Sequence, residues 1–366
     1  MIPTLPRLRS LLAGLASTLL AASVHAAPPP LPALNIDIKQ TSVSGISSGG
    51  FMAVQFQVAH SSIVKGAGIV AAGPWNCAQG DVMTATTKCS CTLPTATCQV
   101  SATSASVPAL LNATRQAAAK GLIDDPANLA RQKAYTFAGG KDGTVPKPVV
   151  AQLGDYYRAL GMPQSSLSAV VKADAGHTMP TVDFGETCGF TGEPYIGQCG
   201  IDGARGILSW IYGPLKARQA ATPKGKFIQF DQKPYEPSTG FFSFAKTGLD
   251  STGWLYVPEA CAKGQPCRLH IALHGCKQGQ SYLPLTLVGG GSDLYYGTTF
   301  VKHAGYDTWA DENRLVILFP QAVSTWNNPN GCWDWWGYTD AHYADKQGIQ
   351  IRALRSMVDR LSSGAH

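Results

Sequence analysis

Short, continuously apolar segments recur along this sequence, and their pattern narrows the choice of fold. Residues 63–72 (IVKGAGIVAA), 269–273 (LHIAL) and 315–319 (LVILF) are almost entirely apolar. Strands of this kind are covered on both faces, as they are in a parallel sheet. Shorter candidate strands lie at residues 34–38, 135–138 and 168–172, with one leading to Val43, and segments of helical character at residues 51–59, 107–120, 148–160 and 349–361. This alternation predicts an α/β fold with a mostly parallel central sheet flanked by helices.

The first 26 residues have the parts of a secretory signal peptide. Arg7 and Arg9 supply positive charge, residues 11–23 are apolar, and Val24-His25-Ala26 offers small residues at the two positions that a signal peptidase reads. A membrane anchor is the alternative, but the apolar run is shorter than the ~20 residues that span a bilayer. We therefore expect an exported protein, in the medium or the periplasm, that is not held in a membrane.

All ten cysteines lie beyond residue 26. An even number in an exported chain predicts five disulfides. Metal binding is the alternative, but Cys89-Ser90-Cys91 lacks the C-x-x-C spacing and has no histidine nearby, so we expect no metal site. Sequence order indicates Cys188–Cys199 and Cys261–Cys267 as local pairs. The four cysteines between residues 77 and 98 allow three pairings, and the sequence does not choose among them.

Charge and composition exclude several classes of protein. A hydrophobic fraction of 45% is too high for a disordered chain. The net charge is +6, but lysine and arginine do not cluster, so we expect no nucleic-acid partner. The length of 366 residues permits two domains or one large α/β domain. Residues 217–240, rich in Lys, Pro and Gly, could be a domain linker or a long loop within one domain.

The segment Gly45-Ile46-Ser47-Ser48-Gly49 matches G-x-S-x-G, the nucleophile elbow. A serine on a sharp turn between a strand and a helix sits in strained backbone geometry, and the flanking glycines remove steric clashes. The pattern alone is weak, but here it lies between a candidate strand and a candidate helix. We therefore expect Ser47 to be the nucleophile of a serine hydrolase, which requires no cofactor.

A serine nucleophile needs a histidine base oriented by a carboxylate. His177 lies in a loop directly after the candidate strand at residues 168–172, where an α/β hydrolase carries its base. Asp142 follows the strand at residues 135–138 in a glycine-rich turn and is the favoured acid. Asp174 is the nearest rival, although its position three residues before His177 is better suited to shaping the loop.

The site also needs backbone amides that bind the oxyanion, and one should be the amide of Ser48. The second usually comes from a His-Gly loop after an earlier strand, but here His274-Gly275-Cys276 lies far downstream of Ser47. The order of the parts is thus rotated, as in a circularly permuted α/β hydrolase. Because chain termini often lie close together, such a permutation is tolerated.

Together these segments resemble the extracellular polyhydroxybutyrate depolymerases of the single-domain, circularly permuted kind. The resemblance runs from about Ser42 to Leu361 and includes the box around Ser47, AGGKDGTVP, AGHTMP, LHGC and the segment NGCWDWWGY. It implies one catalytic domain over residues 27–366 with no separate polymer-binding domain. The residues to which it assigns roles are Ser47, Asp142 and His177 as the triad, the amides of Ser48 and Cys276 as the oxyanion hole, a Cys276–Cys332 disulfide, and Trp333 as a subsite wall beside the serine.

Four tryptophans, at positions 326, 333, 335 and 336, support an apolar cleft independently of the resemblance. Bulky rings in a loop rich in Gly and Asn suit the wall of a cleft for an aliphatic chain. Plain core packing is an equal alternative for Trp335 and Trp336.

The expected function is a secreted serine esterase that cleaves poly(3-hydroxybutyrate) to short hydroxyacid products. The same triad could instead act on soluble oligoesters, aryl esters or a poly(amino acid). A third possibility is a catalytically inactive protein that binds a polymer or the cell wall. The expected partner is therefore a polyester polymer or oligomer, and the sequence leaves the oligomeric state open.

Overall fold

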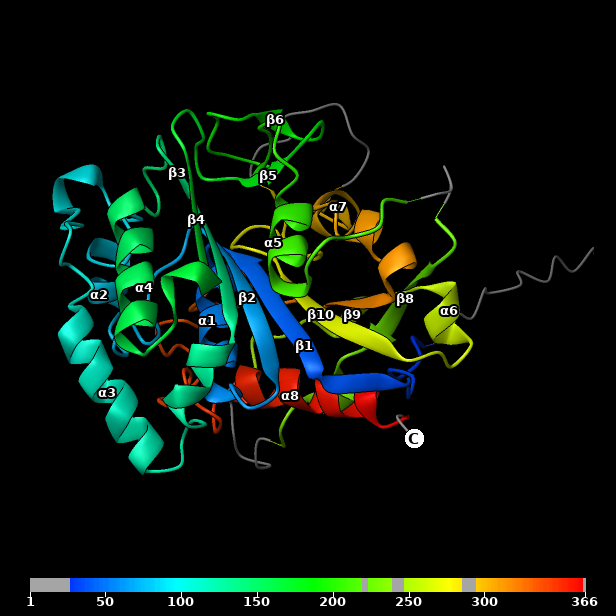
Figure 1. Ribbon diagram of the computed structural model, residues 1–366. Coiled ribbons are helices and arrows are strands. Elements are labelled where there is room, and N and C mark those ends of the chain that lie inside the picture. Colours follow the sequence, from blue (N-terminus) through cyan, green and yellow to red (C-terminus); the bar gives the residue numbers. More distant parts are fainter. Residues whose placement is uncertain (1–26, 219–222, 239–246, 285–293, 365–366) are drawn as a thin grey trace, which may run out of the picture.

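The computed structural model describes residues 27–218, 223–238, 247–284 and 294–364 (Figure 1). The predicted signal peptide lies outside these residues. The fold is built on one eight-stranded sheet with the order β4-β3-β2-β1-β10-β11-β9-β8. The strands are β1 (Ile36–Ile46), β2 (Val64–Val70), β3 (Lys133–Gly139), β4 (Leu167–Lys172), β8 (Lys226–Asp231), β9 (Thr252–Val257), β10 (Cys267–Leu273) and β11 (Leu315–Phe319).

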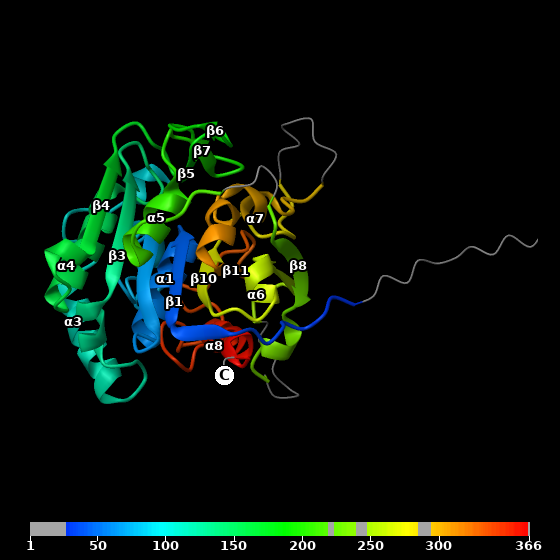
Figure 2. The ribbon, with the colours of Figure 1, turned by 45° about the vertical axis from the view of Figure 1, so that its right-hand side comes forward.

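The sheet is mostly parallel, as the sequence predicts. Neighbouring strands run parallel from β4 through to β11, and β9 is antiparallel to both β11 and β8. The candidate strands at residues 34–38 and before Val43 form one long β1 with a register shift between Ile36 and Thr41. A smaller sheet, β5 (Met179–Thr181), β7 (Ile196–Gln198) and β6 (Glu186–Thr187), lies near the ends of β3 and β4 (Figures 1 and 2).

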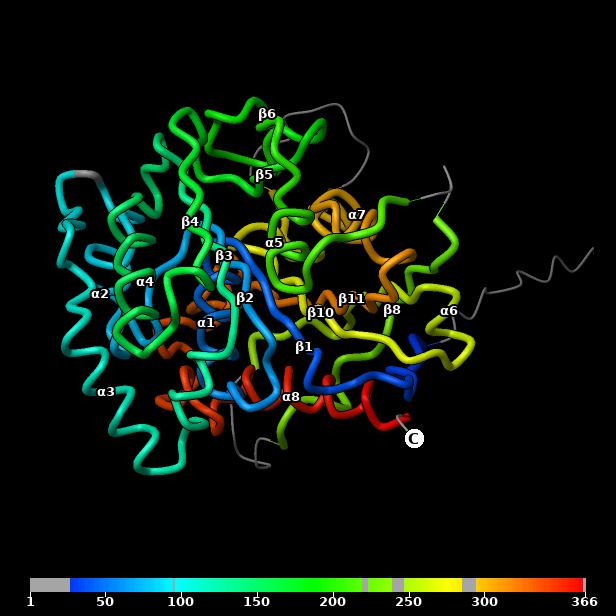
Figure 3. Tube along the Cα trace, in the orientation of Figure 1, coloured from blue at the N-terminus to red at the C-terminus, as the bar shows by residue number. Residues whose placement is uncertain are grey.

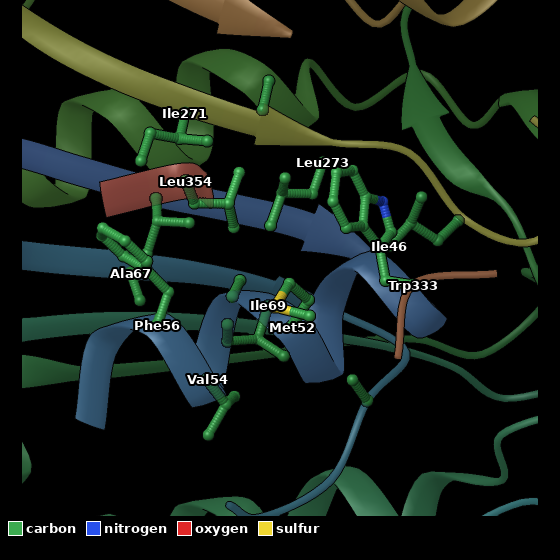
Figure 4. Close-up of a cluster of buried hydrophobic side chains, with 14 of the residues drawn as sticks. Ile46, Met52, Val54, Phe56, Ala67, Ile69, Ile271, Leu273, Trp333 and Leu354 are labelled. Atoms are coloured by element: carbon green, nitrogen blue, oxygen red, sulfur yellow. The ribbon is translucent and has the colours of Figure 1, made fainter. Parts of the chain in front are cut away.

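Helices cover both faces of the sheet. Glycines 66 and 68 of β2 lie against Ile211 and Ile207, which lets α5 approach closely. The intervening Ala67 and Ile69 point to the other face, toward α1, so β2 reads as one apolar run because both of its faces are covered (Figure 4). The helices are α1 (Ser48–Ala59), α2 (Val82–Thr87), α3 (Val107–Ala119), α4 (Lys147–Ala159), α5 (Gly203–Tyr212), α6 (Glu259–Ala262), α7 (Thr299–His303) and α8 (Ile349–Ser362).

The hydrophobic core continues up to the elbow around Ser47. Ile46, Met52 and Leu273 are almost fully buried together with Trp333 (Figure 4). These residues come from β1, α1, β10 and the segment after β11, so distant parts of the chain meet beneath the elbow.

The chain enters the sheet at its centre. It builds β1 to β4 toward one edge, then returns to the opposite edge with β8 and β9 and fills the gap with β10 and β11. The last helix, α8, packs on β1, and the amide of Leu34 donates to the carbonyl of Leu361 at 2.9 Å (Figure 3). The described ends of the chain thus lie side by side, as the permuted order requires; the permutation itself stays a prediction.

Two of the differences between the fold and the expectations concern β8 and α5. Within the stretch at residues 217–240, the described residues form β8 of the same sheet, so this part is neither a domain linker nor only a loop. Helix α5 was not predicted, because its segment begins with glycine and arginine between glycine-rich loops. Its apolar face becomes recognisable only in the structure, where it packs against the glycines of β2.

Five disulfides are present, as the cysteine count predicts. Cys188–Cys199 and Cys261–Cys267 are the local pairs that the sequence order indicated. The cluster between residues 77 and 98 pairs as Cys77–Cys89 and Cys91–Cys98, and the fifth bond joins Cys276 to Cys332. Of the helices formed by the described residues, none is both long and apolar enough to cross a membrane.

Three buried histidines should make the fold sensitive to acid. Burial lowers the pKa of His60 and His274 to about 4 and that of His270 to about 3. An unfolded histidine titrates near 6.5, so between pH 6.5 and pH 4 the unfolded state binds more protons. We therefore expect the free energy of unfolding to fall by about 1 kcal/mol per pH unit for each histidine as the pH drops through this window.

Urea unfolding between pH 7.5 and pH 5 measures this effect. His60→Gln removes one of the three groups, so its stability should decline less steeply with pH than that of the wild type. A midpoint that does not change across this window would contradict the assignment.

Candidate active site

The backbone at Ser47 has the strained geometry of a nucleophile elbow. Its φ is 56° and its ψ is −124°, at the junction of β1 and α1. A Cβ on Gly45 would overlap the backbone of Gly49, and a Cβ on Gly49 would overlap the carbonyl oxygen of His274. Only glycine fits at these two positions, which explains the spacing of the motif. The Ser47 amide donates to the carbonyl of Val70 at 3.0 Å, so β2 also holds the turn.

His177 and Asp142 form a buried pair at the ends of neighbouring strands. The Nδ1 of His177 lies 2.8 Å from Oδ2 of Asp142, and the two residues are 4% and 6% exposed. Oδ1 of Asp142 accepts from the amides of Thr144 and Val145, both at 2.8 Å. Because Oδ2 is an acceptor, Nδ1 carries the proton, and Nε2 is left as the basic nitrogen.

The rival carboxylate plays another part. Asp174 is exposed and pairs with Lys172 at 2.6 Å. It makes no hydrogen bond to His177 among the described residues, and its expected role in shaping the loop stays a prediction.

Ser47 and His177 line the same cavity, whose volume is about 420 Å³. No hydrogen bond joins their side chains within the described part of the chain. Catalytic hydrogen bonds of this type often tighten only when substrate binds, so their shared cavity is the relevant geometry. The structure therefore brings these two residues together with the Asp142 carboxylate behind the imidazole.

The His-Gly loop lies directly against Ser47. A Cβ on Gly275 would stand 3.3 Å from the Cβ of Ser47, and both Gly275 and Cys276 line the cavity. Among the described residues, the amides of Ser48 and Cys276 donate to no protein acceptor. Free amides beside the serine are what an oxyanion hole requires.

His274, which the sequence analysis used only to mark this loop, fixes its orientation. Its Nδ1 donates to the carbonyl of Gly275 at 2.7 Å, and its Nε2 accepts from the amide of Ala322 at 3.0 Å. In a trans peptide the carbonyl and the following amide point in opposite directions. Holding the Gly275 carbonyl therefore turns the Cys276 amide the other way. Burial keeps His274 neutral by lowering its pKa to about 4.

Trp333 was expected to form a wall of the cleft beside the serine, and the structure places it elsewhere. This side chain is fully buried, packs 5.5 Å from the His274 ring, and is absent from the cavity surface. Its amide donates to the Ser48 hydroxyl at 3.3 Å, so it supports the elbow from below. Trp335 and Trp336 line the cavity instead, with Trp335 stacked on Phe51 at 4.2 Å.

Asp334, between these tryptophans, organises their loop. Its buried carboxylate accepts from the amides of Gly337, Tyr338 and Thr339 at 2.7, 3.0 and 2.8 Å. No role was predicted for Asp334 from the sequence. An aspartate followed three residues later by glycine inside an aromatic segment is the signal of such a turn.

A second serine–histidine pair lies in the core. The His270 ring is hydrogen-bonded to the hydroxyls of Ser42 at 2.6 Å and Ser44 at 2.8 Å. The hydroxyl of Tyr306 is hydrogen-bonded to that of Ser44. These residues are fully or almost fully buried, and none of them lines the cavity that holds Ser47. His270 also makes no hydrogen bond to a carboxylate among the described residues. This network cross-links β1 to β10 and is structural.

The Cys276–Cys332 disulfide ties the His-Gly loop to the tryptophan loop, with the two Cα atoms 4.1 Å apart. Cys332→Ser is expected to lower the free energy of unfolding by about 4 kcal/mol, because the bond closes a loop of 56 residues. It should also lower kcat up to about 100-fold by loosening one oxyanion donor. Urea unfolding and ester hydrolysis measure the two effects.

The matched control is the double variant Cys261→Ser/Cys267→Ser, which removes a bond at the opposite end of β10. It should cost stability without lowering kcat. Equal kcat losses in the two variants would show that the Cys276–Cys332 bond has no special effect on the site.

The fold and this site define a serine carboxylic-ester hydrolase of the α/β-hydrolase type. The chain is 41% identical to the poly(3-hydroxybutyrate) depolymerase of Delftia acidovorans over 98% of its own length, and it spans 66% of that relative. It is 36% identical to the polyhydroxybutyrate depolymerase of Talaromyces funiculosus, over 91% of this chain and 93% of the relative. The chain belongs to the polyhydroxybutyrate depolymerase family.

Solved structures agree with this family assignment, although no family model matches the chain. A PHB depolymerase variant complexed with the R3HB trimer has a TM-score of 0.77, and the PHB depolymerase from Penicillium funiculosum has a TM-score of 0.75. Each is 34% identical, and each similarity covers 92% of this chain and 100% of the other. The α/β-hydrolase fold predicted from the sequence is thereby confirmed.

Proposed function

We propose that this protein is a secreted esterase that hydrolyses poly(3-hydroxybutyrate) to short hydroxyacid oligomers and monomers. The observation that carries this proposal is the cavity shared by Ser47, His177 and the His-Gly loop, in a chain whose relatives are named for this polymer. The cysteine pairing and the signal-like N-terminus support export, because disulfides persist in oxidising compartments.

In the proposed mechanism, Ser47 attacks the ester carbonyl while Nε2 of His177 takes its proton. The bond from Nδ1 to Asp142 stabilises the imidazolium that forms. The amides of Ser48 and Cys276 bind the oxyanion of the tetrahedral intermediate. His177 then protonates the leaving alcohol, and a water molecule activated by the same nitrogen releases the acyl group as an acid.

The surroundings of the cavity favour an apolar solid substrate over an acidic soluble polymer. Exposed apolar side chains stand on segments that border the cavity: Val82, Met83, Phe190 and Trp326 are 51%, 53%, 47% and 89% exposed. Large exposed apolar side chains gathered at one site mark a binding surface. Among the described residues, the lining carries one lysine and no carboxylate, so a basic rim is absent there.

Turbidity clearing with product analysis tests the substrate assignment. Wild-type protein should clear suspensions of amorphous poly(3-hydroxybutyrate) and release hydroxyacid monomers and short oligomers. A parallel assay with crystalline polymer distinguishes the ability to hydrolyse the ester from the ability to attack an ordered polymer surface. Cleavage of aryl esters or soluble oligoesters without any release from the polymer would favour the alternative substrates and overturn this proposal.

A further inference from the structure

A single lysine stands beside the proposed oxyanion hole. Lys277 directly follows Cys276, and the cavity surface that the described residues form carries no other lysine and no arginine, aspartate or glutamate. It takes part in no salt bridge within the described part of the chain. A half-buried cation without a close partner at the reaction site calls for a functional explanation.

The backbone holds Lys277 firmly in place. Its φ of 64° lies in the left-handed region, which side chains rarely adopt and which costs free energy. Its amide donates to the carbonyl of Asn330 at 2.7 Å, and the neighbouring Cys276 is bonded to Cys332. The lysine is therefore presented to the cavity from a loop that is anchored on both sides.

Glu193 is a carboxylate whose pKa responds to the charge of Lys277. Burial raises the pKa of Glu193, and the charge of Lys277 lowers it by less; the two side chains form no salt bridge among the described residues. No salt bridge among the described residues would therefore have to break for Lys277 to receive the carboxylate of a ligand.

We propose that Lys277 binds the free carboxylate of the hydroxyacid unit on the leaving-alcohol side of the scissile ester. This inference rests on the proposed ester hydrolysis and specifies which ester bonds are preferred. Interior repeats of a polyester are neutral, so the only group a lysine can recognise by charge is the terminal carboxylate. In a poly(3-hydroxybutyrate) chain that carboxylate stands one repeat unit from the last ester bond. The preferred substrates are therefore carboxyl-terminated chain ends and soluble oligomers with a free acid.

A matched pair of substrates tests the charge directly. The 3-hydroxybutyrate trimer is compared as its free acid and as its methyl ester, and the measured quantity is the ratio of kcat/KM for acid over ester. We expect Lys277→Gln to lower this ratio about tenfold, in line with the loss of one charge-assisted hydrogen bond. Lys277→Arg should retain the ratio within about twofold because it keeps the charge.

The control variant is Lys263→Gln, at the opposite end of β10, which should not change the ratio. Raising the salt concentration should lower the wild-type ratio because it screens the charge pair. A ratio in Lys277→Gln within twofold of wild type would overturn the proposal. This includes the case in which kcat/KM falls equally for acid and ester, which would indicate a general effect on the oxyanion.

Product inhibition gives a second readout that does not depend on polyester cleavage. The free dimer acid should inhibit hydrolysis of p-nitrophenyl butyrate by wild type, and Lys277→Gln should raise its inhibition constant about tenfold. If wild type cleaves the aryl ester but neither trimer, the proposed polyester function fails while the carboxylate site is still judged by this inhibition. Equal inhibition of the two proteins would refute the carboxylate site itself.

Discussion

Ser47→Ala is expected to reduce ester hydrolysis by at least about 10⁴-fold while leaving the fold intact. The hydroxyl is the group that becomes acylated, and the oxyanion amides and the cavity alone retain little catalysis. Alanine keeps a Cβ at the strained position, so the backbone of the elbow should not change. Rates of p-nitrophenyl butyrate hydrolysis and thermal unfolding of the purified variant measure both expectations.

Ser42→Ala is the informative control, because Ser42 also contacts a histidine. It removes a hydrogen bond in the core, so it should lower stability while the protein remains active. A fluorophosphonate probe should label wild type and Ser42→Ala but not Ser47→Ala. Near-wild-type turnover by Ser47→Ala, or probe labelling that survives the substitution, would overturn the assignment. Failure to label the wild type would instead favour an inactive binding protein.

The positions of Ser47, Asp142 and His177 could be predicted because each depends on local sequence. In a parallel sheet, the loops after neighbouring strands meet at one edge, so short motifs after apolar runs are enough to gather the candidates there. Gly49 is required by its close approach to the carbonyl oxygen of His274, a contact that no local pattern shows. Part of the glycine pattern in the elbow motif is therefore set by tertiary packing and not by the local turn alone.

The roles of the tryptophans could not be predicted in the same way. Trp333 and Trp335 are two residues apart in one segment, yet the first is buried under the elbow and the second lines the cavity. The turn held by Asp334 and the disulfide at Cys332 give these two side chains different directions, and both features depend on tertiary packing. The strand β8 was missed for a similar reason, because an edge strand has one exposed side and a weak apolar pattern.

Asp142→Asn should lower kcat by about 10⁴-fold with little change in KM. The structure gives the reason atom by atom. Oδ1 of Asp142 receives two amide hydrogen bonds, so an asparagine placed here keeps its carbonyl oxygen on that side and turns its NH₂ group toward His177. An NH₂ donor requires Nδ1 to be an acceptor. The imidazole proton then moves to Nε2, the nitrogen that must accept the proton of Ser47.

The pair of His342, which is exposed, and Asp345, which is buried, provides the matched control. Asp345→Asn makes the same chemical change at a histidine outside the cavity and should leave kcat within about twofold. Nitrogen NMR of His177 should report the proton on Nδ1 in wild type and on Nε2 in Asp142→Asn. Because two backbone amides hold the side chain in place, both proteins should unfold cooperatively at similar temperatures. A kcat within tenfold of wild type would mean that Asp142 does not orient the base, and the pairing of residues 142 and 177 would then be only structural.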